Sequence, residues 1–544
     1  MPNRKIYQLL FILFTTCTMY AQLPTGPEIA WQRCYGTTGH DFFTDAINTS
    51  DGGILAFVVY DNNDGDCAGC LDGDGRLMKF DSDLNIIWQK SYYISVKQIL
   101  EVSDGFVLCG ATQLDTGYAA ENHGLTDIFI IKTDLAGNFQ WSRCYGSTGV
   151  DNFTAVTATS DGGYMITGST YGSNEDIPFH YGSGFFLDAV IFKLDNEGEI
   201  EWVKVLGGSD HDGLVNTLPL NEDEYLMIIG ANSNDYDLSS SMILGAKFWF
   251  FRIDESGNMY DYNFHIANED VYAIYNSFFM RGEITFVALS NAESLLFPAI
   301  VGHAGYDTGI GVLDEDFNIL EINHFGGSES DITSFAIVSD NTIYLIGRSK
   351  SFDFDLPGNY NAGAADDYWL FAIDTNFQLL WSRNFGGSHS SGEWTYKITN
   401  SPGKLVLMDN FIYFFGQCQV PDVFPDYDIS CGHINPDLDD DTDAWLVAFD
   451  LSTVKEIESP ENNSDFLIYP NPAENNLFTI EATQPDTQVY EIIIYDITGR
   501  KVFYESTGIN NKTILDLNFL GSGIYVISIY GNDQKKSEQK LFIH

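Results

Sequence analysis

The chain has 544 residues and a formal net charge of −51, from 26 basic and 77 acidic side chains. Because phosphate backbones are held by Lys and Arg, this balance argues against a nucleic-acid partner, and it disfavours docking on an anionic membrane surface. A chain of this length exceeds one ordinary core, so we expect several domains or a repeat array. Residues 23–455 hold 64 acidic and 18 basic residues, a net charge of −46. We interpret this as a solvated acidic surface, with cation binding in acidic loops as the alternative.

Residues 1–22 have the pattern of a signal peptide. Arg4 and Lys5 precede the apolar stretch Ile6–Phe14, and Ala21-Gln22 offers a small-residue cleavage point. A lipoprotein signal through Cys17 is the alternative. The apolar run is too short to span a bilayer, and no other stretch is long enough, so we expect no transmembrane segment.

A short phrase recurs seven times, roughly 55–65 residues apart. It is an aromatic or aliphatic run that ends in aspartate, and its copies are Arg76–Asp81, Asp127–Asp134, Asp188–Asp195, Lys247–Asp254, Thr308–Asp314, Asp367–Asp374 and Asp443–Asp450. A second strand in most units opens with Trp and runs into glycines, as at Trp141 and Trp381. Such a period is typical of a repeat architecture.

Two more short strands precede each phrase, split by a tight turn such as Ser160-Asp161-Gly162-Gly163. Each unit therefore has four strands, here named a, b, c and d. Four-stranded antiparallel sheets repeated radially make a β-propeller, so the sequence predicts an all-β, seven-bladed propeller over residues 23–451. The first element after the signal is a d strand, and no d strand follows Asp450. We therefore expect Trp31–Tyr35 to pair with Asp443–Asp450 and close the ring, which also removes an exposed edge.

After the propeller the pattern changes. Residues 452–465 are polar and predict a linker. Residues 466–544 contain about seven short alternating strands, which predict a small Ig-like β-sandwich. The motifs YPNPAENNL, IIIYDITGRKV and LGSGIYVISI follow in order, and their marker residues are Tyr469, Pro470, Asn471, Pro472, Gly499, Arg500, Gly523 and Tyr525.

This C-terminal segment closely resembles the type A sorting domain of the type IX secretion system of Bacteroidetes. The resemblance implies export by the general secretory route, passage across the outer membrane with the type IX machinery as partner, and attachment to the cell surface or release. The propeller half resembles propeller cargo of the same pathway, a group with no fixed activity.

In a four-stranded blade the d–a and b–c connections share one rim. The b–c loops are long and dissimilar, and they span 61–75, 113–126, 171–187, 231–246, 291–307, 351–366 and 419–442. Variable loops on a rigid scaffold are where binding usually occurs, so we predict that this rim and the mouth of the central channel form the working face.

Acidic residues cluster on this rim. Calcium takes six to eight oxygen ligands, and carboxylates at alternate positions can converge on it. The calcium candidates are Asp61, Asp64, Asp66, Asp72 and Asp74, with a second cluster at Asp437, Asp439, Asp440, Asp441 and Asp443. The full EF-hand spacing is absent, and turn formation by Asp and Gly is the alternative. Asp41, Asp151, Asp212 and Asp331 recur at one offset, which indicates hydrogen bonding within the d–a bend.

Seven cysteines remain after the signal peptide, so at least one thiol is free unless an intermolecular bridge forms. The disulfide candidates are Cys67 with Cys70 in one loop and Cys418 with Cys431 flanking another. Cys34, Cys109 and Cys144 lie in strand-like runs and are expected to be buried small hydrophobes. A zinc or redox role for Cys67–Cys70 is disfavoured because there is no second CxxC.

The sequence contains none of the common hydrolase or nucleotide-binding motifs, namely GxSxG, HExxH and the P-loop. His40, His123, His211, His303 and His433 are spread over different blades, which disfavours a metal ring. We expect an exported monomer that binds a glycan or protein through its long-loop rim and has no obligate cofactor, with calcium as an optional one. A secreted hydrolase or lyase acting on polysaccharide or peptide is the alternative, and a structural surface component is a third.

Overall fold

The structure is a computed structural model, and it describes most of the chain after residue 25. The described residues are 26–67, 75–182, 184–221, 223–239, 247–266, 271–280, 283–291, 306–356, 366–387, 403–419, 428–432, 442–454, 466–469, 477–482, 489–496, 500–508, 512–517, 519–520, 523–531 and 534–543. The chain divides into two compact units, residues 1–455 and 456–544. They are described separately below.

In the described part of the first unit, short Val-, Ile- and aromatic-rich runs form seven four-stranded antiparallel sheets. The first three are β2 (Phe42–Asn48), β3 (Ile54–Val59), β4 (Gly75–Phe80) and β5 (Ile86–Tyr92); β6 (Gln98–Val102), β7 (Gly105–Thr112), β8 (Asp127–Asp134) and β9 (Phe139–Tyr145); and β10 (Asp151–Ala158), β11 (Tyr164–Thr170), β12 (Asp188–Leu194) and β13 (Ile200–Leu206).

The next three sheets continue in chain order. They are β14 (Asp212–Pro219), β15 (Glu224–Ala231), β16 (Lys247–Asp254) and β17 (Met259–Ile266); β18 (Val271–Met280), β19 (Glu283–Asn291), β20 (Tyr306–Leu313) and β21 (Ile319–Phe325); and β22 (Asp331–Ser339), β23 (Thr342–Ser349), β24 (Asp367–Asp374) and β25 (Leu379–Phe385). The last sheet combines β26 (Lys404–Met408), β27 (Phe411–Gln419) and β28 (Thr442–Asp450) with β1 (Glu28–Tyr35). Four 3-10 turns are described: η1 (Gly65–Cys67), η2 (Gly117–Ala119), η3 (Tyr236–Leu238) and η5 (Leu451–Thr453).

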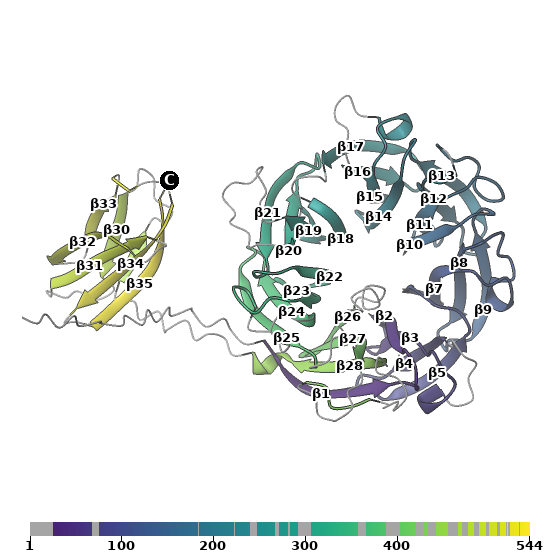
Figure 1. Ribbon diagram of the computed structural model, residues 1–544, viewed down its shortest axis with the longest axis horizontal. Helices are drawn as coiled ribbons and strands as arrows, with labels where there is room; N and C mark the ends of the chain where they lie inside the picture. Colours follow the sequence, from purple (N-terminus) through teal and green to yellow (C-terminus); the bar gives the residue numbers. More distant parts are fainter. Residues whose placement is uncertain are drawn as a thin grey trace, which may run out of the picture. The chain divides into compact units, whose positions relative to one another are not determined.

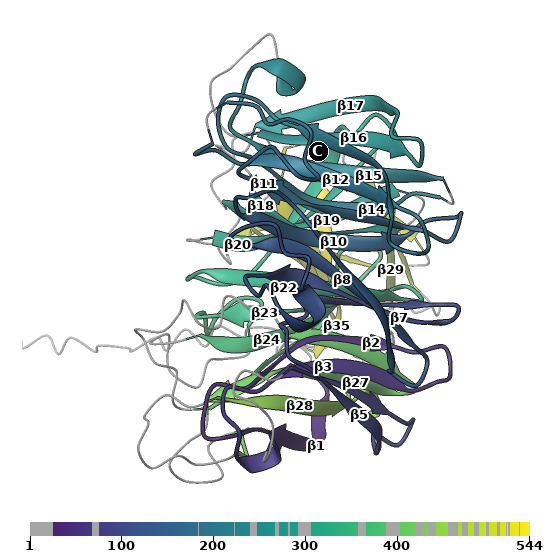
Figure 2. The ribbon, with the colours of Figure 1, turned by 90° about the vertical axis from the view of Figure 1, so that its right-hand side faces the viewer.

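The sheets form a ring, with the first strand of each sheet nearest the centre and the last at the perimeter (Figure 1). Seen from the side, the strands run roughly along the axis of the ring (Figure 2). The strand β1 pairs antiparallel with β28, with Trp31 opposite Ala448 and Tyr35 opposite Ala444. The expected closure of the ring by Trp31–Tyr35 is therefore confirmed.

The core of the propeller lies between neighbouring sheets. One cluster joins β2–β4 to the closing sheet, where Phe43 contacts Phe415 edge to face with ring centroids 5.1 Å apart. Trp369 and Trp445, from two copies of the repeated phrase, are fully buried. Burying a large apolar side chain stabilises a fold by about 1.5–3 kcal/mol, so these repeated rings bind each sheet to its neighbours.

The polar residues of the repeated phrase also have structural positions. Lys193 is buried, and its ammonium lies 2.7 Å from Asp161 of the a–b turn and 2.9 Å from Glu201. The terminal aspartate caps the c–d turn, as at Asp134, whose Oδ1 accepts the backbone N–H groups of Ala136 and Asn138. The Asn138 side-chain amide, which donates to Asp134 Oδ2 at 2.9 Å, and these backbone bonds hold the pKa of Asp134 below its usual value. The phrase is therefore a folding element and not a binding motif.

The second unit packs two sheets around one apolar core that includes Phe478, Ile492 and Ile527. One sheet has the order β29 (Phe466–Tyr469), β30 (Leu477–Ala482) and β33 (Lys512–Asp516), and the other β32 (Lys501–Gly508), β31 (Val489–Asp496), β34 (Gly523–Gly531) and β35 (Gln534–Ile543). The expected small β-sandwich is confirmed.

The sorting-domain markers fall at element ends in this unit. Tyr469 ends β29, Arg500 precedes β32, and Gly523 begins β34. Tyr525 packs against the core of the sandwich. Pro470, Asn471, Pro472 and Gly499 lie outside the described residues.

Candidate functional site

The d–a and b–c connections meet on one face of the ring, here called the loop rim. The backbone N–H of Gly36, after β1, donates to Asp66 Oδ2 at 3.1 Å, and that of Ser328, after β21, donates to Asp353 Oδ1 at 2.8 Å. In both cases a d–a bend contacts the b–c loop of the adjoining sheet. The expected arrangement of the loop rim is therefore confirmed, and the long loops are anchored to the scaffold at their bases.

The described calcium candidates bind backbone amides. Asp64 accepts the N–H of Thr38 through Oδ1 at 2.8 Å and the hydroxyl of Thr38 through Oδ2 at 2.6 Å. Asp66 accepts Gly36 N–H, and Asp61 Oδ2 lies 3.5 Å from the N–H of His40.

The same arrangement recurs at other blades, where the loop carboxylates fasten the d–a bend. Asp72, Asp74, Asp437, Asp439, Asp440 and Asp441 lie outside the described residues. Among the described residues, no group of three metal-ligating side chains is close enough to hold an ion.

Several d–a bends also contain a pair of buried carboxyl groups. One belongs to the aspartate at the start of strand a, and the other to the aspartate at the start of strand c in the preceding blade. Asp212 Oδ2 accepts the N–H of Gly208, and Asp331 Oδ2 that of Gly327. Asp41 and Asp151 make the equivalent bonds to Thr37 and Ser147. The expected role of these four residues in the bend is confirmed.

Glycine at the end of strand d is required by the strand c carboxylate. A Cβ on Gly207 would lie 2.0 Å from Asp188 Oδ1, and one on Gly36 would lie 1.9 Å from Asp443 Oδ1. Burial, with a contribution from the nearby Asp212 carboxylate, raises the pKa of Asp188 to about 7. Burial likewise raises the pKa of Asp41 to about 7, with Asp443 contributing.

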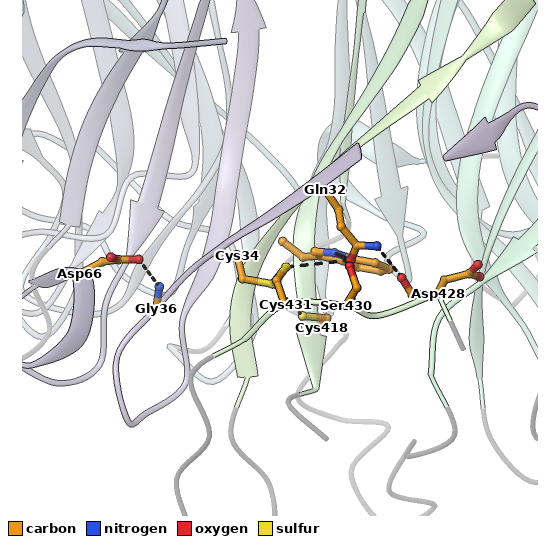
Figure 3. Close-up of a disulfide and its surroundings, with 9 residues drawn as sticks. Gln32, Cys34, Gly36, Asp66, Cys418, Asp428, Ser430 and Cys431 are labelled. Carbon is orange, nitrogen blue, oxygen red and sulfur yellow. Dashed lines mark hydrogen bonds between the residues drawn. A yellow bond between two sulfur atoms is a disulfide. The ribbon is translucent and has the colours of Figure 1, made fainter. Parts of the chain in front are cut away.

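The cysteines pair differently from the sequence prediction. Cys34 in β1 is disulfide-bonded to Cys431, with 5.6 Å between their Cα atoms (Figure 3). The predicted Cys418–Cys431 bridge is therefore wrong, and so is the assignment of Cys34 as a free thiol. Cys418 is a buried free thiol whose sulfur lies 3.8 Å from that of Cys34.

The physical reason is that ring closure pairs β1 with β28 and so brings Cys34 beside Cys431, a neighbour that sequence order does not reveal. Cys67 is disulfide-bonded, while Cys70, its predicted partner, lies outside the described residues. Cys109 and Cys144 are free and buried, as expected.

The histidines of the loop rim are tied to separate sheets. His123 Nδ1 lies 2.8 Å from Asp127 Oδ2. His211 Nδ1 accepts the backbone N–H of Leu187 at 3.2 Å, which leaves its Nε2 as the protonated nitrogen. His303 and His433 lie outside the described residues.

Sequence reasoning missed a group of four aromatic residues on this rim, of which Tyr181 is half-buried and the other three are exposed. Phe179, Tyr181, Phe185 and Tyr236, here called the aromatic cluster, come from two b–c loops of adjacent sheets, 171–187 and 231–246. The Phe179 and Tyr181 rings are 5.2 Å apart, and the Tyr181 and Tyr236 rings 4.9 Å. Phe185 is 83% exposed and Tyr236 62% exposed. The signal in the sequence was the density of aromatic residues in loop 171–187.

The aromatic cluster is held in place by polar contacts beneath it. The backbone N–H of Tyr181 donates to Asp188 Oδ2 at 2.5 Å, and Asp235 Oδ1 accepts the N–H of Ser209 at 2.8 Å. Burial and a hydrogen bond to Asp237 raise the pKa of Tyr181 to about 12, so its hydroxyl stays protonated at neutral pH. Tyr236 has a φ of 49°, a left-handed conformation uncommon for a bulky side chain. The rings therefore sit on fixed loops.

Residues 467–544 match the secretion system C-terminal sorting domain. The protein is cargo of the type IX secretion system. The domain directs export to the cell surface or the extracellular space, and the type IX machinery is its partner in that step. The resemblance of the C-terminal motifs to this domain is thereby confirmed.

No curated protein matches the sequence. Among solved structures, a puromycin hydrolase has 10% identity and a TM-score of 0.41, over 93% of this chain and 62% of that chain, so this cargo protein spans less than two thirds of that structure. YCF48 bound to a D1 peptide has 9% identity and a TM-score of 0.38, over 79% and 99%. BamB from Moraxella catarrhalis has 11% identity and a TM-score of 0.28, over 59% and 96%. Within the described part of this cargo protein, no helix is long and apolar enough to cross a membrane.

Proposed function

We propose that this exported propeller binds a neutral glycan on its loop rim, with the aromatic cluster as the binding surface. The observation that carries the proposal is the row of three rings, Phe179, Tyr181 and Tyr236, with successive centroids 5.2 and 4.9 Å apart. Exposed apolar patches with polar groups around them mark ligand sites in secreted proteins. The C–H faces of a pyranose ring pack on aromatic rings, while its hydroxyls need hydrogen-bond partners.

Those partners lie at the edge of the cluster. The hydroxyls of Tyr181 and Tyr236 and the carboxylate of Asp237 are donors and acceptors of the kind that sugar hydroxyls bind. Aromatic side chains also lose little conformational entropy on binding, because each has only two χ angles. The anchored loops reduce the ordering cost further, since the rings are already positioned.

A glycan array of the exported chain tests the proposal, with binding followed by titration calorimetry on the best neutral oligosaccharide. Tyr236→Ala is expected to weaken binding at least tenfold, or about 1.4 kcal/mol, because it removes an end of the ring row. Tyr262→Ala is the matched control, since Tyr262 is 72% exposed but lies on the perimeter strand β17. Equal losses in both variants, or no binding to any neutral glycan, would contradict the proposal. Turnover of a polysaccharide in the same assay would favour a hydrolase.

A further inference from the structure

The mouth of the central channel holds a cavity of about 360 Å³. It is lined by the starts of first strands and the end of one second strand, which places it on the loop-rim side of the ring. The lining residues are Lys97, Gln98, Ala111, Asn152, Phe153, Thr154 and Lys404. Its volume lies within the range of about 300–1,000 Å³ that is typical of small-molecule sites.

Two of the propeller's few cations face this cavity. Lys404 begins β26, and its ammonium lies 3.5 Å from Asp45 Oδ1 and 4.5 Å from the centre of the Phe335 ring. Asp45 is itself bound by the backbone N–H of Ile99. These contacts fix Lys404 at the wall of the channel.

Lys97 is the second cation, and it differs from Lys404 in having no carboxylate of the described residues within ion-pair distance. Its side chain reaches solvent, yet the channel wall partly desolvates the ammonium and lowers the pKa of Lys97. Residues 23–455 carry a net charge of −46, yet no described carboxylate forms an ion pair with Lys97. An anionic ligand would supply the missing counter-charge.

The other walls indicate an organic anion. Phe153 and Ala111 supply apolar surface, while Asn152 is exposed and its side-chain amide makes no hydrogen bond to the rest of the described chain. Gln98 has its amide bound to both backbone groups of Val156, so it holds β6 against β10 and leaves the ligand to Lys97, Asn152 and Lys404. A ligand that carries hydroxyl groups and one carboxylate matches the residues that line this cavity.

We propose that the channel mouth is a binding site for an acidic sugar, in which Lys97 and Lys404 hold the carboxylate of a uronate residue and Phe153 packs against its ring. This site uses other residues than the aromatic cluster, so either site stands if the other fails. An acidic peptide offers the same carboxylate, but it lacks the hydroxyls that Asn152 and the channel wall would bind.

Titration calorimetry of the exported chain with digalacturonate tests the site, with galactobiose, inorganic sulfate and an acetylated glutamate dipeptide as comparison ligands. Digalacturonate is expected to bind, and Lys97→Gln to weaken it by about tenfold or more, since one of two counter-charges is lost. Lys90→Gln makes the same charge change on the perimeter strand β5 and is expected to leave the affinity unchanged.

Three outcomes would overturn the inference. They are no binding of digalacturonate by the unmodified protein, an equal loss in the Lys97 and Lys90 variants, and binding of sulfate or the glutamate dipeptide as tightly as digalacturonate. Thermal melting of both variants confirms that they fold, which is expected because the Lys97 side chain is exposed.

Discussion

Cys34, in the first strand of the ring, is disulfide-bonded to Cys431, 397 residues later in the chain. The bridge joins β1 to the loop that precedes β28, the strand with which β1 pairs. It therefore reinforces the same junction as the closing hydrogen bonds. A covalent link across a chain of this length removes a large loop-closure entropy from the unfolded state.

Removal of this bridge is the first prediction. Cys431→Ser, made together with Cys418→Ser to prevent re-pairing, is expected to lower the free energy of unfolding by about 2–5 kcal/mol, measured by guanidinium unfolding. Cys418→Ser alone is the control, because it removes a buried thiol and leaves the bridge. A double variant as stable as the control would show that the bridge adds nothing to closure.

The third sulfur at this junction gives a second prediction. Cys418 Sγ lies 3.8 Å from Cys34 Sγ, so Cys431→Ser alone, refolded with oxidised glutathione, is expected to form a Cys34–Cys418 bridge. Burial raises the pKa of the Cys418 thiol well above its usual value, so this pairing forms during folding and not by exchange in the native protein. Peptide mapping under non-reducing conditions detects it, and free thiols at both Cys34 and Cys418 in the refolded variant would contradict it.

The buried carboxyl pairs predict a pH dependence. Folding raises the pKa of Asp188 to about 7, from an unfolded value near 3.9, so the folded state binds more protons between these values. Stability is therefore expected to rise as pH falls from about 8 to about 5, by up to about 1.4 kcal/mol per pH unit for each such carboxyl. Thermal melting across that range measures it.

Asp188→Asn is expected to reduce this slope, because the amide has no proton to gain. Asp134→Asn is its control, since the pKa of Asp134 is lowered and its titration lies below the window. An unchanged slope in the Asp188 variant would show that other groups cause the pH dependence.

The close approach of glycine to carboxylate gives a fourth prediction. Gly207→Ala places a methyl carbon only 2.0 Å from Asp188 Oδ1, which is a steric clash. The substitution is expected to lower the free energy of unfolding by about 1–3 kcal/mol. Gly213→Ala is the matched control, since its new carbon would meet only Ser169 Cβ at 3.8 Å. Equal melting temperatures for the two variants would contradict the packing argument.

The sorting domain predicts export. A chain that lacks residues 467–544 is expected to remain in the periplasm. A fluorescent protein fused to a signal peptide and to residues 456–544 is expected to leave the cell. Cell fractionation and immunoblotting measure both. Export of the truncated chain would show that another segment carries the signal.

The ring and its closure were predictable because the repeat is local and periodic. Trp31–Tyr35 has the pattern of most of the other d strands, and only one sheet lacked a d strand. The loop contacts were not predictable in the same way. Asp64 and Asp66 have the spacing of a calcium loop, but the amides they bind belong to residues 36–38, on a segment that only the fold brings near.

The aromatic cluster combines two loops from successive repeats, with Tyr181 and Tyr236 55 positions apart in the sequence, so a search within one repeat does not reveal it. Tyr181 belongs to the sheet that ends with β13, and Tyr236 to the next sheet, which begins with β14. Their rings meet because these two sheets are neighbours in the ring. The prediction of the Cys418–Cys431 disulfide failed for a related reason. The alignment of Cys34 beside the chain near Cys431 follows from closure, and combining the predicted closure with the cysteine positions would have found it.

The pairing of β1 with β28 also fixes an order of events. The chain is made from its N-terminus, so the first strand of the ring is available long before its partner, which is the last strand of the same unit. Until Asp450 has emerged, β1 has an open edge and the cysteine of that strand has no partner. The ring can therefore close only after the whole propeller has been made.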